Sequence, residues 1–188
     1  MATQPTMRNL GSPAPDFSLP DVRTGATVSR ADFSDRPLVV MFICNHCPYV
    51  KRIQPGLVTL GNDYAATDVA IVGIASNDPA LSPDDSPEEL ARVADELGYV
   101  FPLLFDEDQS AAKAYEAVCT PDIYVFDRGH QLVYRGQFDD ARPSNDEPVT
   151  GRDLRTAVDA VLAGLPVPED QVPPIGCSIK WTPGNEPG

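Results

Sequence analysis

The chain has 188 residues, with 14 Lys and Arg against 28 Asp and Glu, so its formal net charge at pH 7 is −14. This length suits one domain with a buried core, and 42% hydrophobic and 22% charged residues argue against a disordered chain. The acidic excess excludes a broad surface for nucleic acid or an anionic membrane, because phosphate binding needs a basic face.

The first half of the sequence predicts a hairpin followed by two buried strands. Residues 1–10 are polar, and we expect them to form a flexible lead-in. Residues 17–28 hold two short apolar segments around a Gly-containing turn, which predicts a hairpin. Residues 38–43 and 69–75 are unbroken apolar runs of strand length, which indicates strands covered on both faces of a sheet.

Helices are predicted between and after these strands. Residues 49–64 carry apolar side chains on one side, and Ser86-Pro87-Glu88-Glu89 has the cap, proline and acidic first turn of a helix start. The remaining expected elements are a strand over 101–105, a helix over 109–117, a hairpin over 123–134 and a closing helix over 153–162. This order predicts an α/β fold in which helices flank a central mixed β-sheet.

The composition changes after residue 164. Residues 165–188 are rich in proline and show no helical periodicity, yet apolar residues alternate over 175–181 as in a short strand. We therefore expect residues 11–164 to form the domain, and this C-terminal tail to pack on it in extended form.

The chain contains four cysteines, Cys44, Cys47, Cys119 and Cys177. Residues 1–15 hold no apolar stretch of signal-peptide length, and no later run approaches a membrane span. The sequence is therefore read as a cytoplasmic protein, where thiols are normally reduced. In that setting a close cysteine pair is typical of catalysis or metal binding.

Cys44-Asn45-His46-Cys47 lies directly after a predicted buried strand and directly before a helix. The free N–H groups and the dipole of a helix N-terminus stabilise a thiolate, and the two-residue spacer suits a disulfide. We expect Cys44, at the more exposed end, to attack and Cys47 to resolve the mixed disulfide. Asn45 and His46 are the predicted supporting residues. A protonated His46 would favour the thiolate, whereas the alternative is an exposed side chain without effect.

A zinc site is the competing interpretation of the pair. It would need two further ligands, and Cys119 and Cys177 are single and far apart in the sequence. The pattern therefore favours a redox centre, with no metal and no organic cofactor expected.

Three further segments accompany the motif. They are the opening 11–19 (GSPAPDFSL), Thr120-Pro121 before the predicted hairpin, and 176–181 (GCSIKW) in the tail. The strand–CxxC–helix unit with its later Thr-Pro resembles the thioredoxin-like superfamily, and the opening resembles the peroxiredoxin-like branch, the AhpC/TSA family. Residues 42–51 (FICNHCPYVK) and the tail segment resemble thioredoxin-like proteins labelled thiol-disulfide isomerases, which carry a CNHC motif. This resemblance covers residues 11–187.

The resemblance implies a role for the Thr-Pro segment. Pro121 matches the cis-proline whose loop packs against the active-site sulfurs in this superfamily. A cis peptide bond there would leave the backbone of Thr120 free to pair with an extended substrate chain. The alternative is an ordinary trans proline that opens a strand.

The sequence also departs from the family. The buried acid that thioredoxins place six residues before the first cysteine is Leu38 here, and Asn77 and Asp78 are candidates to replace it or to cap a loop. The Thr or Ser that typical peroxiredoxins place three residues before the peroxidatic cysteine is absent. Cys44 holds that place relative to the second cysteine, and Met41 holds it relative to the first. Neither register therefore fits, which argues against the usual peroxidase mechanism.

Two cysteines lie outside the motif. Cys177 is expected either to be buried as a small hydrophobic residue or, if the tail folds back, to exchange with Cys44. Cys119 directly precedes Thr120, so its side chain should point away from that of Thr120, and we expect a structural role.

The predicted function is a thiol-disulfide oxidoreductase. Its partners would be a disulfide-bearing protein or a small-molecule thiol or peroxide, together with an external reductant, and neither nucleic acid nor a membrane is expected. The alternatives are a thiol-dependent peroxide reductase, in which Cys44 is oxidised to sulfenic acid and Cys47 condenses with it, and a non-catalytic redox-sensing or metal-binding module.

Overall fold

The computed structural model describes residues 2–186. Its strands are β1 (Ala2–Thr3), β2 (Ser18–Pro20), β3 (Thr27–Ser29), β4 (Leu38–Phe42), β5 (Ala70–Ala75), β6 (Leu103–Phe105), β7 (Cys119–Thr120), β8 (Asp122–Phe126), β9 (Leu132–Gly136) and β10 (Gly176–Ser178). Its α-helices are α1 (Pro48–Tyr64), α2 (Pro87–Leu97), α3 (Ser110–Tyr115) and α4 (Arg152–Leu162), and its 3-10 helices are η1 (Arg30–Phe33) and η2 (Pro83–Asp85). Within this described part, no helix combines the length and apolar character needed to cross a bilayer.

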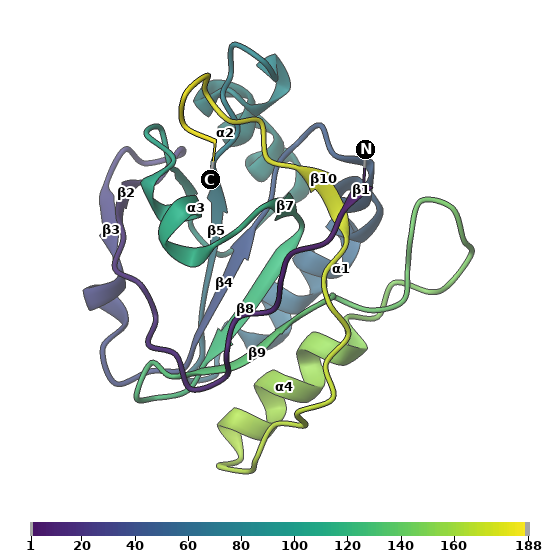
Figure 1. The fold of residues 1–188 in the computed structure, drawn as a ribbon. Coiled ribbons are helices and arrows are strands. Elements are labelled where there is room, and N and C mark those ends of the chain that lie inside the picture. The colour runs from purple at the N-terminus through teal and green to yellow at the C-terminus, as the bar shows by residue number, and fades with distance from the viewer. Residues whose placement is uncertain (1, 187–188) are drawn as a thin grey trace.

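A five-stranded mixed sheet forms the centre of the molecule, in the order β6-β5-β4-β8-β9 (Figure 1). β4 runs parallel to β5 and antiparallel to β8, which confirms the predicted α/β fold with a central mixed sheet. Phe42, the last residue of β4, lies between Ile74 on β5 and Asp122 on β8. The loop that follows β4 therefore emerges between the end of β5 and the start of β8.

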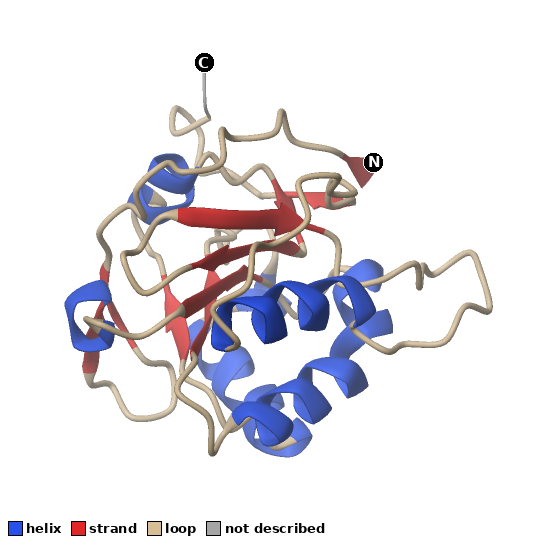
Figure 2. Cartoon of the chain, turned by 90° about the horizontal axis from the view of Figure 1, so that it is seen from below, coloured by secondary structure: helices blue, strands red, loops and turns tan. Residues whose placement is uncertain are grey.

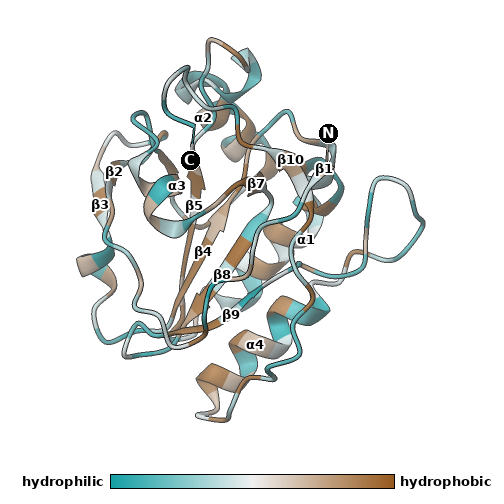
Figure 3. Ribbon diagram, in the orientation of Figure 1, coloured by the Kyte–Doolittle hydropathy of each residue, from teal (hydrophilic) through white to brown (hydrophobic). Residues whose placement is uncertain are grey.

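The core is divided between the two faces of this sheet. Val39 and Met41 of β4 pack in a cluster with α1, α2 and α4, whereas Leu38, Val40 and Phe42 pack with α3 and the β2–β3 hairpin. α1, α2 and α4 contribute to the cluster on one face of the sheet, and helices gather on one side of it in Figure 2. Both faces of β4 are covered, so its apolar run is continuous and the central strands are brown in Figure 3.

The helix starts follow the local signals of the sequence. α1 begins at Pro48, directly after its N-cap Cys47. α2 begins after Ser86, whose side chain accepts a hydrogen bond from the N–H of Glu89, and it ends at Gly98 in a left-handed conformation. These are the boundaries that capping chemistry predicts.

The two ends of the chain meet in a second, three-stranded sheet, in which β10 of the tail lies between β1 and β7 (Figure 1). The tail is anchored beyond this strand, because Ile179 is buried and Trp181 packs against the cluster around α3. Residues 2 and 3, expected to belong to a flexible lead-in, instead form β1 against β10. The sequence offered no sign of this pairing, because a strand of two residues is too short to show an alternating pattern.

Candidate redox site

Cys44 and Cys47 lie at the end of β4, in the short loop that leads into α1. Both are free thiols, and both are buried, with 3% and 0% of their surfaces exposed. The expected difference in exposure between the two cysteines is therefore small. Cys47 is the N-cap residue of α1, so its sulfur lies at the positive end of the helix dipole.

Thr120 contacts both sulfurs. Its hydroxyl oxygen lies 3.1 Å from Cys44 Sγ, and its carbonyl oxygen lies 3.2 Å from Cys47 Sγ. The Thr120–Pro121 peptide is cis, as the resemblance implied. The expectation that the backbone of Thr120 is free is wrong, because β10 pairs with β7 and places Cys177 opposite Thr120.

A buried carboxylate, that of Asp85, hydrogen-bonds to the backbone of the loop that contains the CxxC motif. Asp85, the last residue of η2, is fully buried, and its Oδ1 accepts hydrogen bonds from the N–H groups of Asn45 at 2.6 Å and His46 at 3.3 Å. Its Oδ2 accepts hydrogen bonds from Asn77 Nδ2 at 2.9 Å and Ser82 Oγ at 2.6 Å. The same oxygen lies 2.5 Å from His46 Nδ1. Asp85 thus fixes the two residues between the cysteines.

Asp85 was missed by the sequence analysis. Nothing in the run Ser82-Pro83-Asp84-Asp85 separates the buried carboxylate from the preceding Asp84. Asn77 does lie near the motif, as one of the two candidates, but it binds Asp85 and does not stand in for a proton acceptor. Asp78 caps its own loop by accepting a hydrogen bond from the N–H of Ala80 at 2.8 Å.

The supporting residues Asn45 and His46 are tied into the same network. Asn45 Nδ2 donates to the carbonyl oxygens of Asp84 at 3.0 Å and Glu89 at 3.1 Å. His46 Nδ1 also lies 2.9 Å from Ser82 Oγ, and its side chain is 22% exposed. His46 is therefore a half-buried, hydrogen-bonded side chain, in contrast to the exposed side chain of the alternative interpretation. Among the described residues, its buried Nε2 has no hydrogen-bond partner.

The two cysteines differ in the charge that they carry. Burial raises the pKa of Cys44 well above its ordinary value, and the hydrogen bond to Cys47 and the negative charge of Asp85 add to this. The pKa of Cys47 falls to about 5, because hydrogen bonds from Cys44 and Cys177 and the N–H of Val50 outweigh its burial. Cys44 therefore holds a proton, which it shares with the thiolate of Cys47.

Thr120 opposes this distribution of charge. Its hydroxyl lowers the pKa of Cys44 by donating to the sulfur, and its carbonyl oxygen at 3.2 Å from Cys47 accepts only from a protonated thiol. The proton can therefore pass from Cys44 to Cys47 without leaving either sulfur unsatisfied. This is the property that a dithiol needs if both sulfurs are to react in turn.

Asp85 stays ionised although it is buried, because its hydrogen bonds lower its pKa by more than burial raises it. Burial would raise the pKa of Asp85, but the hydrogen bonds from Ser82, from the N–H of Asn45, and from His46 and Asn77 lower that pKa below its ordinary value. The ionised carboxylate of Asp85 thus provides an acceptor for the hydrogen-bond donors of Asn45, His46, Asn77 and Ser82 around the CxxC motif.

The same residues were tested as a metal site. Cys44, His46 and Asp85 each offer a ligand atom, and these atoms lie within 4.8 Å of one another. A metal ion bound to Asp85 would have to displace the amide and hydroxyl donors that surround it, and would leave them buried without partners. The donor set therefore suits a hydrogen-bonded carboxylate and does not suit a metal ligand.

The other two cysteines differ sharply. Cys177 is partly exposed, lies opposite Thr120 in the sheet and packs against the cluster that contains both cysteines of the motif, where it lowers the pKa of Cys47. Cys119 is fully buried, burial raises its pKa, and its sulfur lies 3.8 Å from the carbonyl oxygen of Pro121. The surroundings of Cys119 agree with a packing role.

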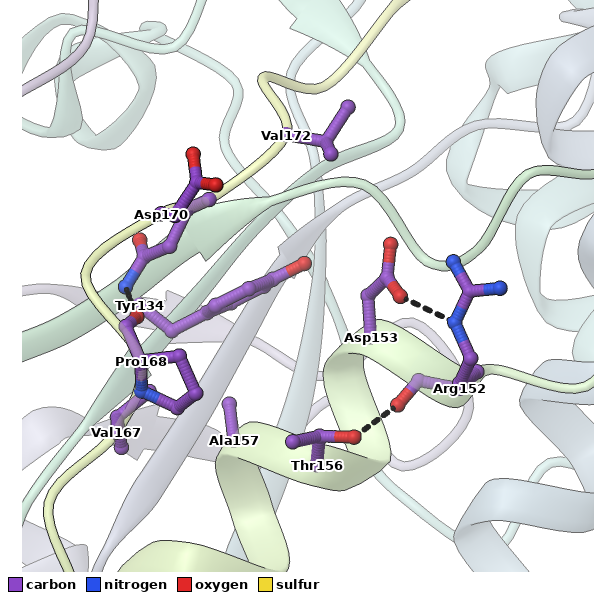
Figure 4. Close-up of a pocket in the computed structure, with 10 residues that line it drawn as sticks. Tyr134, Arg152, Asp153, Thr156, Ala157, Val167, Pro168, Asp170 and Val172 are labelled. Carbon is purple, nitrogen blue, oxygen red and sulfur yellow. Dashed lines mark hydrogen bonds and ion pairs between the residues drawn. The ribbon is translucent and has the colours of Figure 1, made fainter.

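Five pockets of the described residues are lined by no cysteine. The pocket drawn in Figure 4, of about 220 Å³, lies between α4, Tyr134 of β9 and tail residues 167–172, and contains no cysteine. The hollow beside Pro121 measures only about 10 Å³ and is lined in part by Pro174 and Ile175. The tail thus fills the space next to the cis-proline.

Residues 10–135, more than half of the chain, match the model of the AhpC/TSA family. The chain belongs to the AhpC/TSA family. The chain is 25% identical over 130 residues to the thiol-disulfide oxidoreductase ResA of Geobacillus kaustophilus, covering 69% of this chain and 70% of that protein. The crystal structure of a conserved protein from Geobacillus kaustophilus is 55% identical, with a TM-score of 0.95 and 98% of each chain covered.

A structure of lower sequence identity supports only the assignment of the fold. A thiol:disulfide interchange protein of the thioredoxin family from Chlorobium tepidum is 19% identical, with a TM-score of 0.64 and 83% and 99% of the two chains covered. The predicted thioredoxin-like fold of the AhpC/TSA branch is confirmed. These likenesses support a thioredoxin-like redox function for this member of the family.

Proposed function

We propose that this AhpC/TSA protein is a thiol-disulfide oxidoreductase whose redox centre is the Cys44–Cys47 pair. The observation that carries the proposal is the pair of buried free thiols at the start of α1, which both contact Thr120 next to the cis-proline, with the pKa of Cys47 lowered to about 5. A low-pKa thiolate beside a second thiol is the arrangement that thiol–disulfide exchange requires. The protein would act where thiols are kept reduced, as in the cytoplasm.

Cys44 is the sulfur that meets the substrate in this proposal, since it retains 3% exposure whereas Cys47 has none. Its proton passes to Cys47, and the hydroxyl of Thr120 donates to the resulting thiolate. The Cys44 sulfur attacks a substrate disulfide, one substrate sulfur leaves as a thiolate, and a mixed disulfide forms. Cys47 then loses its proton and attacks Cys44, which releases the reduced substrate and leaves a Cys44–Cys47 disulfide.

A peroxide reductase is the second candidate, and one contact favours it. Thr120 brings a hydroxyl to within 3.1 Å of Cys44, which supplies in space the group that the sequence lacks three residues before this cysteine. The Cys44 thiolate would take one oxygen from the peroxide and release an alcohol or water, and Cys47 would then condense with the sulfenic acid and release water.

Parallel assays of insulin-disulfide reduction and peroxide consumption test these two functions. We expect insulin reduction in the wild type and in the matched control Cys119→Ser, and none in Cys44→Ser or Cys47→Ser. Cys47→Ser should trap a mixed disulfide at Cys44. Full activity in Cys44→Ser would overturn the proposal, and trapping at Cys47 would reverse the order of attack. A fast, saturable consumption of peroxide without insulin reduction would favour the second candidate.

The non-catalytic alternative is tested by metal analysis. Because Asp85 is already saturated with hydrogen-bond donors, we expect the purified, reduced protein to carry much less than one zinc per chain. Stoichiometric zinc that is lost in Cys44→Ser would support the metal-binding module instead.

A further inference from the structure

The tail strand β10 lies directly against the redox pair. β10 pairs with β7, so that Cys177 lies opposite Thr120, and its other edge pairs with β1 (Figure 1). Gly176 permits this approach, because a Cβ at this position would lie 1.9 Å from the carbonyl oxygen of Thr120. The backbone contact therefore fixes where Cys177 stands relative to the site.

Residues after β10 hold it in place. The N–H of Ile179 donates to the carbonyl of Val118 at 3.0 Å, and the N–H of Lys180 donates to Asn77 Oδ1 at 2.8 Å. Asn77 is the residue whose amide nitrogen also binds Asp85. The tail and the loop of the CxxC motif are thus anchored to the same side chain.

The three sulfurs form a series. Cys47 is the member next to Cys177, because the carbonyl oxygen of Thr120, the residue opposite Cys177 in β7, lies 3.2 Å from Cys47 Sγ, and Cys177 packs against the cluster that contains Cys44 and Cys47. Cys44 and Cys47 are buried, whereas Cys177 is partly exposed. The main-chain edge of Thr120 is already paired, so Cys177 is the sulfur of the series that solvent reaches without displacement of the tail.

We propose that Cys177 is a third redox thiol, which takes over the disulfide from the buried pair and presents it to a small-molecule thiol reductant. This inference rests on the proposed function, because it needs the Cys44–Cys47 disulfide as its starting point. It names the class of reductant, a low-molecular-weight thiol, because Cys177 is only partly exposed and the backbone of Thr120 beside it is already paired with the tail.

The exchange conserves atoms and electrons. The Cys177 thiolate attacks Cys47 Sγ, a Cys47–Cys177 bond forms, and the Cys44–Cys47 bond breaks. Cys44 leaves with the electron pair and takes up the proton that Cys177 released. A first external thiol then attacks Cys177 and frees Cys47, and a second external thiol attacks the resulting mixed disulfide. Two external thiols are thereby oxidised to one disulfide, and all three cysteines return to the reduced state.

The electrostatics of the site agree with this direction. In the reduced protein, burial and the hydrogen bond to Cys47 raise the pKa of Cys177 to about 11, while Lys180 acts in the opposite sense. When Cys47 is part of a disulfide, it carries no charge that would hold the proton on Cys177. Cys47 is also a good leaving group in the next step, because a thiol with a low pKa leaves quickly.

Peptide mapping of Cys44→Ser tests whether a disulfide between Cys47 and Cys177 forms. Trypsin places Cys47 in peptide 31–51, Cys177 in peptide 156–180 and Cys119 in peptide 114–128. After oxidation with diamide, acid quenching and alkylation, we expect peptides 31–51 and 156–180 to be linked in Cys44→Ser and not in Cys44→Ser/Cys177→Ser. Free thiols at Cys47 and Cys177 in oxidised Cys44→Ser, or a link from Cys47 to Cys119, would overturn the proposal.

Re-reduction kinetics test whether a Cys47–Cys177 disulfide speeds the reduction of the oxidised protein by an external thiol. The oxidised wild type and Cys177→Ser are mixed with glutathione, and the return of free thiols is followed. Because an attacking thiol held within the protein reacts much faster than one in solution, we expect Cys177→Ser to be about tenfold slower, and Cys119→Ser to match the wild type. Equal rates in the wild type and Cys177→Ser would contradict the relay.

The two proposals fail in different ways. A Cys44–Cys47 disulfide in the oxidised wild type appears as a loss of two hydrogens within peptide 31–51. If this disulfide does not form, the proposed function is refuted. If that disulfide forms while the link to 156–180 is absent in Cys44→Ser, only the role of Cys177 is refuted.

Discussion

Two aspartates near the redox pair are fully buried, Asp85 at the end of η2 and Asp122 directly after the cis-proline, and they are satisfied in opposite ways. Asp85, beneath the cysteines, accepts hydrogen bonds from backbone N–H groups and neutral side chains. Asp122, the first residue of β8, is paired with Arg135 through two contacts of 3.2 and 2.8 Å, and both side chains are fully buried. Asp85 fixes the loop of the CxxC motif, and Asp122 fixes the central sheet through Arg135.

Their pKa values move in opposite directions. Burial raises the pKa of Asp122, and Arg135 and Tyr124 offset this only in part. The pKa of Asp85 is lowered, because its several donors outweigh burial. The comparison teaches that the number and geometry of donors decide the ionisation of a buried carboxylate as much as a formal counter-charge does.

The two regions also differ in what they connect. Arg135 donates to the carbonyl oxygens of Thr6 at 3.0 Å and Glu116 at 2.8 Å, which ties the N-terminal segment and the end of α3 to the central sheet. Within residues 2–186, the side chain of Asp85 hydrogen-bonds only to Asn45 and His46 of the site and to Asn77 and Ser82 of the loop 77–85. Loss of the Arg135 pair should therefore damage the fold, and loss of Asp85 should damage the chemistry of the sulfurs.

Arg135→Met should have the largest effect on stability. It leaves the carboxylate of Asp122 buried without its partner, and removal of one member of a buried ion pair costs about 3–5 kcal/mol. Urea unfolding at pH 7 measures this. The control is Arg92→Met, whose ion pairs with Glu89 and Glu96 are exposed, and its unfolding midpoint should barely move. Equal small shifts in both variants would refute the structural role of the buried pair.

Asp85→Asn should have a smaller effect on stability and a specific effect on the sulfurs. An amide cannot accept at both ends, so the free energy of unfolding should fall by about 1–3 kcal/mol. The negative charge that helps to raise the pKa of Cys44 also disappears, so iodoacetamide should alkylate Cys44 faster at pH 7. Asp122→Asn is the matched control, and it should lose stability without faster alkylation of Cys44. The comparison breaks down if both variants change alkylation alike.

The fold was largely predictable from local patterns, and the site only in part. The apolar run of β4 and the capping residues around α2 are local signals, and they placed strand, helix and CxxC motif correctly. Asp85 lies 40 positions after Asn45 and belongs to an acidic run, so its burial depends on tertiary packing that no local period reports.

The contact between Cys177 and Cys47 was equally hidden. An alternating pattern predicts a strand but does not choose its partner, and here the backbone of β7 selects the register. Cys177 was expected either to be buried as a small hydrophobic residue or to reach Cys44, whereas pairing with Thr120 places it beside Cys47.

The pH dependence of the reduced protein separates the two regions further. Because the folded pKa of Cys47 is lowered from 9.0 to about 5, its thiolate contributes stability that is complete above pH 9 and is lost as the pH falls through about 5. Thiolate absorbance at 240 nm should therefore titrate near pH 5 in the wild type and in Asp122→Asn, and this step should be absent in Cys47→Ser. A single titration near pH 9 in the wild type would contradict the assignment of the charge to Cys47.

Ser82→Ala should have the smallest effect, and it probes the donors of Asp85 one at a time. The hydroxyl of Ser82 donates to Asp85 at 2.6 Å, and loss of one such hydrogen bond should cost about 1 kcal/mol at pH 7. A lowered carboxyl pKa contributes stability above the unfolded value of about 4 and loses it as the pH falls through the folded value. The difference in unfolding free energy between Ser82→Ala and the wild type should therefore shrink below pH 4.

The control for this last variant is Ser34→Ala, whose exposed hydroxyl donates to the carbonyl of Ala31 and contacts no titratable group in the hydrogen bonds of the described residues. Any stability that Ser34→Ala loses should be independent of pH between 3 and 7. If Ser82→Ala shows the same flat dependence, the hydroxyl of Ser82 does not stabilise the ionised form of Asp85. The low pKa of that carboxylate would then rest on the N–H of Asn45, His46 and Asn77, which are the remaining donors.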